Sequence, residues 1–98
     1  MKAMRKKYDF ISFLKKYGAD VKYVLGPIKD DYHVHCTVTS IKALNKLLFF
    51  TGEINCAVHV YTNSATPTSA PKIVYRLVIN PVSLEYMVEY HGLKRLKK

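Results

Sequence analysis

The chain has 98 residues, of which 49% are hydrophobic and 23% charged, a balance that is typical of a folded globular domain and excludes a disordered chain. Its formal net charge is +9, and no apolar run approaches the roughly 20 residues of a membrane-spanning helix. We expect a single domain over residues 1–98 that does not enter a membrane. We place it in the cytoplasm, because no secretory signal is visible and two cysteines make no disulfide framework.

The first predicted element is an amphipathic helix over residues 3–17. Its apolar residues recur at helical spacing, its lysines and arginines fall on the opposite face, and Gly18 is expected to end it. A hairpin follows, with strands at 20–27 and 31–38 around a turn at 29–31. The positive charge of the first segment is thus expected to lie along one helix face.

The second half of the chain repeats this alternation of helix and strands. A helix is predicted within residues 39–52, with Thr39 or Ser40 as N-cap and Gly52 as stop. Strands are predicted at 53–61 and 72–80, separated by a flexible loop over 62–71. Asn80 and Pro81 begin a last helix that ends at Gly92, and a basic tail follows over 93–98.

The element order α-β-β-α-β-β-α indicates an α+β fold. Short connections favour antiparallel pairing, and the near-continuous apolar run at 72–80 favours a central strand. We therefore predict a two-layer sandwich in which the three helices cover one face of a four-stranded antiparallel sheet.

Alternation along the strands separates an apolar face from a polar one. The stretch Asp31–Val38 places Cys36 with the valines, toward the helices. The opposite face is expected to carry polar side chains from all four strands. These secondary contact candidates are Lys22, His33, His35, His59, Tyr61 and Arg76.

Three interpretations of this polar face remain open besides a merely solvated surface. His33, His35 and His59 suggest a metal site, but no fourth ligand shares their face, so we expect no metal and no cofactor. The pattern His35-x-Thr37 resembles one half of the signature of 2H phosphoesterases. That family uses two such motifs, whereas Tyr61 stands where the second Thr or Ser belongs, so we expect no enzyme. The third interpretation is contact with bases and phosphates.

The excess charge is concentrated at the two ends of the chain. Residues 1–16 hold six basic residues against one acid, residues 91–98 hold four and no acid, and residues 17–90 are balanced. Such a surplus favours a polyanionic partner, most often nucleic acid. The predicted phosphate contacts are Lys2, Arg5, Lys6, Lys7, Lys16, Lys94, Arg95, Lys97 and Lys98.

The element order also resembles one half of a LAGLIDADG homing endonuclease domain, with the stretch FLKKYGADV (13–21) where that motif ends its helix. Gly18 stands where the metal-binding catalytic acid belongs, so the resemblance implies DNA binding without cleavage.

We expect a small non-enzymatic nucleic-acid-binding protein that prefers DNA to RNA. The alternative is a small viral or mobile-element protein that binds and inhibits a host machine, such as a defence or transcription complex. Tyrosine and arginine, which are favoured at protein–protein hot spots, support it. The sequence also leaves open the hypothesis of a homodimer that forms through the sheet or the helix edges.

Overall fold

The computed structural model describes residues 8–63 and 72–96, and it confirms the predicted order of elements. The helices are α1 (Phe10–Lys15), α2 (Ile41–Glu53) and α3 (Pro81–His91). The strands are β1 (Ala19–Ile28), β2 (Asp31–Val38), β3 (Ala57–Asn63) and β4 (Lys72–Ile79). Within this part of the chain, no helix is long and apolar enough to cross a membrane.

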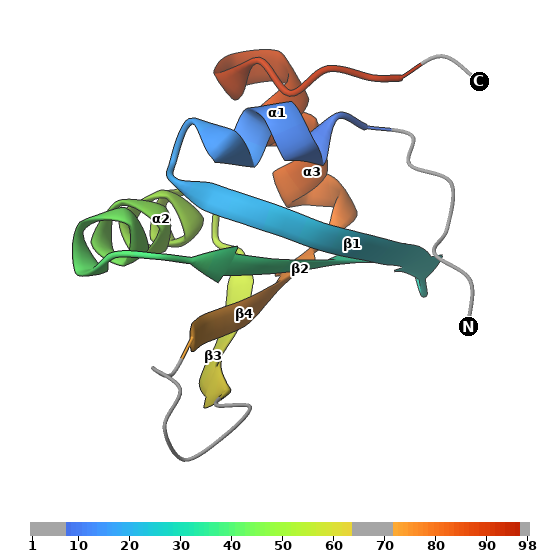
Figure 1. The fold of residues 1–98 in the computed structure, drawn as a ribbon. Helices are drawn as coiled ribbons and strands as arrows, with labels where there is room; N and C mark the ends of the chain where they lie inside the picture. Colours follow the sequence, from blue (N-terminus) through green and yellow to red (C-terminus); the bar gives the residue numbers. More distant parts are fainter. Residues whose placement is uncertain (1–7, 64–71, 97–98) are drawn as a thin grey trace.

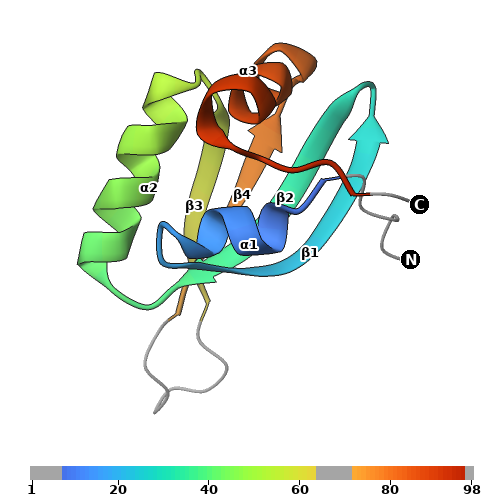
Figure 2. The same cartoon turned by 90° about the horizontal axis from the view of Figure 1, so that it is seen from above.

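The four strands form one antiparallel sheet in the order β1-β2-β4-β3. Figures 1 and 2 show the three helices on the same side of this sheet, with α1 over β1 and β2 and α2 alongside β3. The two-layer α+β sandwich and the central position of β4 are therefore confirmed. In the described part of the chain, the opposite face of the sheet carries no helix.

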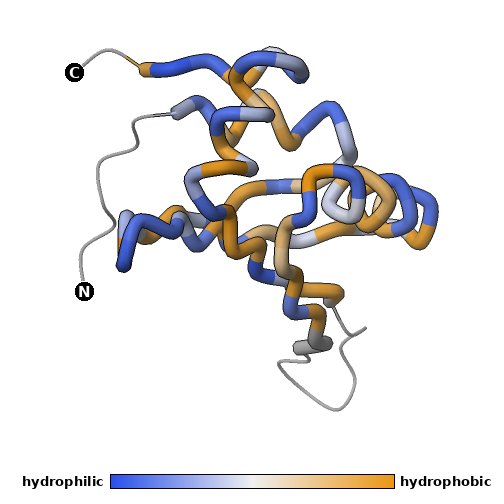
Figure 3. The backbone as a smooth tube through the Cα atoms, turned by 180° about the vertical axis from the view of Figure 1, so that it is seen from behind, coloured by the Kyte–Doolittle hydropathy of each residue, from blue (hydrophilic) through white to orange (hydrophobic). Residues whose placement is uncertain are grey.

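The hydrophobic core fills the space between the helices and the covered sheet face. Strand side chains that point toward the helices meet apolar residues of α1, α2 and α3. The largest fully buried side chains are Tyr75, Phe10, Leu14, Leu47, Leu77, Ile79, Met87, Val24, Val34 and Cys36. Hydrophobic and hydrophilic residues alternate along the strands, so that the same strands also supply the uncovered face (Figure 3).

The turn between β1 and β2 is shorter than predicted. Lys29 and Asp30 alone connect the strands, and their φ angles are 51° and 72°. Positive φ at both central residues is what two-residue hairpin turns favour, because their twist matches that of the strands. Asp31 belongs to β2 and pairs with Ile28.

The predicted helix over 3–17 is too long within the described residues, because α1 starts at Phe10 and ends at Lys15, and residues 3–7 lie outside the described part. The Asp9 side chain accepts a hydrogen bond from the Ser12 N–H at 3.1 Å and so caps the helix. Tyr8 forms an isolated β-bridge with Arg95, and the Asp9 N–H donates to the Lys94 carbonyl at 2.8 Å. Contacts with the other end of the chain therefore hold Tyr8 and Asp9 out of the helix.

The boundary between α2 and β3 also differs from the prediction. The Ser40 hydroxyl caps α2 as expected, but the helix continues past Gly52 to Glu53, with Ile54 as its C-cap. Asn55, with φ of 57°, takes the left-handed position that was assigned to glycine. Ile54 is thus a buried cap residue rather than part of a strand, and β3 begins at Ala57.

Helix α3 matches its predicted ends. Asn80 accepts from the Ser83 N–H at 2.8 Å, Pro81 is the first helical residue, and Gly92 closes the helix with φ of 82°. The predicted basic tail begins as packed structure, because Leu93 is buried in the core. Figure 2 shows this segment running back past α1.

The β3–β4 hairpin projects away from the helices (Figure 1). Thr62 and Asn63, predicted as loop, pair with Ile73 and Lys72, and residues 64–71 of that loop lie outside the described residues. Val60 has the alternation of a core residue but is 47% exposed, because the hairpin extends past the helix layer.

Candidate nucleic-acid interface

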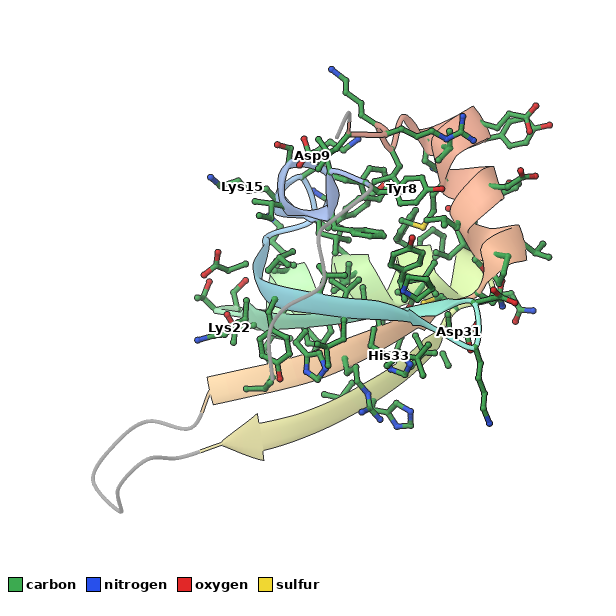
Figure 4. All side chains as sticks on the ribbon, turned by 90° about the vertical axis from the view of Figure 1, so that its right-hand side faces the viewer. Tyr8, Asp9, Lys15, Lys22, Asp31 and His33 are labelled. Atoms are coloured by element: carbon green, nitrogen blue, oxygen red, sulfur yellow. The ribbon has the colours of Figure 1, made fainter. Side chains whose placement is uncertain are left out.

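A groove of about 450 Å³ lies where the end of α1 meets the start of α2. Its lining combines four lysines with small residues of the two helix ends. The lining residues are Lys15, Lys16, Tyr17, Gly18, Ser40, Lys42, Ala43 and Lys46. We call this surface the lysine groove. Figure 4 shows Lys15 extending away from α1 toward solvent.

Gly18 brings the two helix ends together. Its φ of 80° lies in the left-handed region, and a Cβ at this position would stand 2.7 Å from the Ala43 Cβ. Glycine therefore permits both the reversal from α1 into β1 and the close approach of α2. As a result, lysines from two helices that are distant in sequence line one groove.

The electrostatics of the lysine groove favour an anion. Lys15, Lys16, Lys42 and Lys46 are all exposed. The first turn of α2 contains no acidic residue, so the positive end of the helix dipole adds to the lysine charges. The Ser40 hydroxyl accepts the Ala43 N–H at 3.1 Å, which fixes this end of the helix. The groove thus combines exposed lysine charges with the dipole of α2.

A second hollow of about 230 Å³ continues the basic surface toward the C-terminal segment. Asp9, Ser12, Phe13, Lys16, Gly92 and Lys94 line it. Lys16 belongs to both hollows, its Nζ lies 4.6 Å from the centre of the Phe13 ring, and it donates to the His91 carbonyl at 3.5 Å. A band of lysines therefore runs from Lys94 through Lys16 to Lys46, with Asp9 as an acid on its border.

The predicted phosphate contacts are only partly described. Lys16 and Lys94 lie in the band, and Arg95 is exposed beside it, in the bridge with Tyr8. The other predicted contacts lie outside the described residues: Lys2, Arg5, Lys6, Lys7, Lys97 and Lys98. The expected basic face along α1 is absent from the described part, where α1 itself carries Lys15 as its basic residue.

Sequence reasoning missed Lys42 and Lys46 as members of a site. Their spacing of four residues places them on one side of α2. Nothing local connects them with Lys15 and Lys16, since the groove arises from the contact at Gly18.

The uncovered sheet face carries one row of polar side chains across all four strands. Tyr23 of β1 pairs with His35 of β2, which pairs with Arg76 of β4, which in turn pairs with His59 of β3. Figure 4 shows the same face from the side, with His33 pointing away from the helices. The predicted histidines and Arg76 therefore share this face, as alternation required.

Lys22 does not take its predicted place in that row. β1 has one extra residue between Val21, opposite Cys36, and Tyr23, opposite His35. This irregularity moves Tyr23 into the row and leaves Lys22 without a partner in the register. Lys22 is exposed and extends outward from β1 (Figure 4). Tyr61 lies in β3 opposite Val74, and its side chain is outside the described set.

The two residues at the centre of the row, His35 and Arg76, are half-buried. The ring of Tyr23 stacks on His35 with centroids 4.3 Å apart and planes 22° apart. Burial lowers the pKa of His35, and the charges of Arg76 and His33 lower it further. The Nε of Arg76 is buried and has no hydrogen-bond partner among the described residues.

The arrangement disfavours a metal ion at the three histidines. Arg76 stands between His35 and His59 in the register, and its positive charge repels a cation. In the described ranges, no three His, Cys, Asp or Glu side chains gather as ligands. His33 lies in the neighbouring row, opposite Leu25 and Val78.

Neither cysteine is an activated nucleophile. Burial raises the pKa of Cys36 and of Cys56 to about 12, so both thiols are protonated near neutral pH. Cys56 donates to the Val78 carbonyl at 3.4 Å. Both thiols are free and serve the packing of the covered face.

Comparisons of the chain with protein-family models, with curated proteins and with solved structures give no match.

Proposed function

We propose that the protein is a small non-enzymatic nucleic-acid-binding protein that meets phosphates in the lysine groove. The observation that carries the proposal is the convergence of four exposed lysines with the positive end of α2. Phosphates bind at such surfaces because lysine charges and helix N-termini attract anions together. Lys94 and Arg95 extend the contact surface beyond the groove.

The net charge of +9 supports a polyanion rather than a small anion as the ligand. Lysines arranged along a band, rather than around one closed pocket, suit a chain of phosphates. The preference for DNA over RNA rests on the resemblance in element order. We propose the cytoplasm as its compartment, in keeping with two free thiols.

The test is the salt dependence of binding to a labelled DNA duplex, followed by fluorescence anisotropy. If six to ten phosphates are neutralised, affinity falls roughly 10³–10⁵-fold between about 50 and 200 mM salt. Lys42→Gln and Lys46→Gln each reduce the salt slope by about 1. Lys29→Gln, in the β1–β2 turn, removes the same charge outside the groove and is the matched control.

No binding to the duplex at low salt would refute the proposal. Equal effects of Lys42→Gln and Lys29→Gln would refute the assignment to the groove. An RNA duplex of the same sequence, used as competitor, measures the preference for DNA. Replacing Lys2, Arg5, Lys6 and Lys7 by alanine is expected to weaken DNA binding without unfolding the protein. An unchanged salt slope in this variant would contradict a contribution from these four residues.

A second candidate function is binding to a protein partner through α3. Val82 and Tyr90 are 80% and 66% exposed, and with Tyr86 they form a stripe at four-residue spacing. Glu85 and Glu89 are exposed on the same helix, so the stripe suits a partner segment that is apolar with basic flanks. This face supports the alternative of a viral or mobile-element inhibitor of a host machine.

The two candidates differ in their response to nuclease. A partner that is retained after nuclease digestion and lost in a Tyr86→Ala, Tyr90→Ala variant supports the second candidate. Loss of every partner on nuclease digestion supports the first.

A further inference from the structure

The row Tyr23, His35, Arg76 and His59 spans the full width of the uncovered sheet face. With strands about 4.8 Å apart, the three gaps between four strands extend over about 14 Å. The helices lie on the other side of the sheet, so they leave this row open to a ligand (Figures 1 and 4). The lysine groove does not include any of these four residues.

Tyr23 provides a preformed aromatic surface. Tyr23 is 43% exposed. Its ring also stacks on the imidazole of His35. The imidazole holds the phenol ring nearly parallel to itself, at an angle of 22°. An aromatic ring that is already oriented loses little conformational entropy when a base stacks on it.

Arg76 provides a half-buried positive charge two strands from Tyr23. Within the part of the chain that the structure describes, its buried Nε has no hydrogen-bond partner, so the guanidinium is incompletely paired there. The lowered pKa of His35 reflects this neighbouring charge in addition to burial. A phosphate oxygen is a suitable acceptor for an arginine in this position.

The residues around the row are compatible with the binding of a nucleobase. Leu25 and Val78 lie in the next row on one side, opposite His33, and Val74 lies in the row on the other side, opposite Thr37. Asp20 and Asp31 share this face but lie in other rows, opposite Thr37 and Ile28. The centre of the face thus combines an aromatic ring, apolar side chains and a cation.

We infer that the uncovered sheet face binds unpaired nucleotides, with a base stacked on Tyr23 and a neighbouring phosphate at Arg76. A duplex hides its bases in the stack, whereas a single strand exposes them to a four-stranded sheet of this kind. The inference rests on the proposed function and restricts the preferred ligand to single-stranded nucleic acid. The lysine groove attracts any phosphate chain, and the sheet face selects single strands.

The experiment compares three labelled ligands at low salt. They are an oligothymidylate of about 15 nucleotides, an abasic oligomer with the same number of phosphates, and a DNA duplex. The expected affinity is highest for oligothymidylate. Tyr23→Ala weakens that binding by roughly tenfold, because one base loses its stacking partner, and leaves duplex binding unchanged. Tyr23→Phe keeps the ring and the affinity.

Arg76→Gln provides a second, independent variant. It weakens binding to oligothymidylate and to the abasic oligomer alike, since it removes a phosphate contact. Thermal melting checks that each variant is folded. Equal affinity of the wild-type protein for oligothymidylate and the abasic oligomer would overturn the inference, as would unchanged oligothymidylate binding by folded Tyr23→Ala.

The outcomes separate the two proposals. Duplex binding that depends on Lys42 and Lys46, combined with no preference for bases, refutes the sheet-face inference and leaves the proposed function standing. Absence of binding to all three ligands refutes both.

Discussion

The two faces of the sheet come from the same four strands and differ in almost every physical property. On β4, Tyr75 and Leu77 are buried against the helices, whereas Arg76 between them is half-buried on the other face. The covered face supplies the strand side chains of the core, and the uncovered face carries polar and aromatic groups that lie outside that core. This difference separates positions where substitution should change stability from positions where it should change binding.

The largest expected effect belongs to the covered face. Leu77 is fully buried opposite Val34 and Val58, and Leu77→Ala leaves a cavity in the core. We expect a loss of about 3 kcal/mol in the free energy of unfolding, measured by urea denaturation. A loss below about 1 kcal/mol would mean that this face is not the packed core.

Gly18→Ala is expected to have the next largest effect on stability. The new Cβ meets Ala43 at 2.7 Å and the backbone has a φ of 80°, so both a clash and strain oppose the folded state. We expect a loss of about 2 kcal/mol in the free energy of unfolding.

Gly52→Ala is the matched control for Gly18→Ala. A Cβ at Gly52 meets nothing within 4 Å, and the residue lies inside α2. This substitution should stabilise the protein by about 0.5–1 kcal/mol, because alanine favours the helix. Equal effects of the two substitutions would contradict the close approach of the helices at Gly18.

Acid should weaken the fold through His35. Burial and the charges of Arg76 and His33 lower its pKa below the ordinary 6.5, so the unfolded chain takes up this proton more readily than the folded one. The stabilising contribution is fully present above pH 6.5 and is lost as the pH falls toward the folded-state pKa.

The measurement is chemical denaturation of the wild-type protein and of His35→Gln at several pH values. The substitution should reduce the drop in stability between neutral and mildly acidic pH. An unchanged or steeper drop in His35→Gln would show that other groups dominate the acid response.

The smallest effect on stability is expected for Arg76→Met on the uncovered face. Methionine keeps the apolar stem of the arginine and removes a guanidinium whose Nε finds no partner in the described ranges. We expect a change within about 0.5 kcal/mol in thermal or urea unfolding. A loss comparable to that of Leu77→Ala would mean that Arg76 is part of the structural core.

Much of the fold follows from local sequence patterns. Alternation in β2 correctly separates Cys36 from His33 and His35, and Ser40, Asn80 and Gly92 mark helix ends where expected. These predictions succeed because strand alternation and helix capping depend on residues a few positions apart.

The candidate sites were less predictable, because they depend on contacts between distant segments. The end of α1 is joined to Lys42 and Lys46 through Gly18 and Ala43, and Tyr8 is held out of the helix by the bridge to Arg95. The extra residue in β1 replaces Lys22 by Tyr23 opposite His35. Residue propensities and the spacing of residues along the chain do not predict such contacts between distant segments.

The sequence by itself determined the α+β class, the element order and the assignment of β2 side chains to two faces, since each depends on local periodicity. The tertiary structure alone decided which strands lie beside β4, the length of α1, the lysine groove and the row from Tyr23 to His59. The physical reason is that these features arise where packing brings together groups that are far apart along the chain.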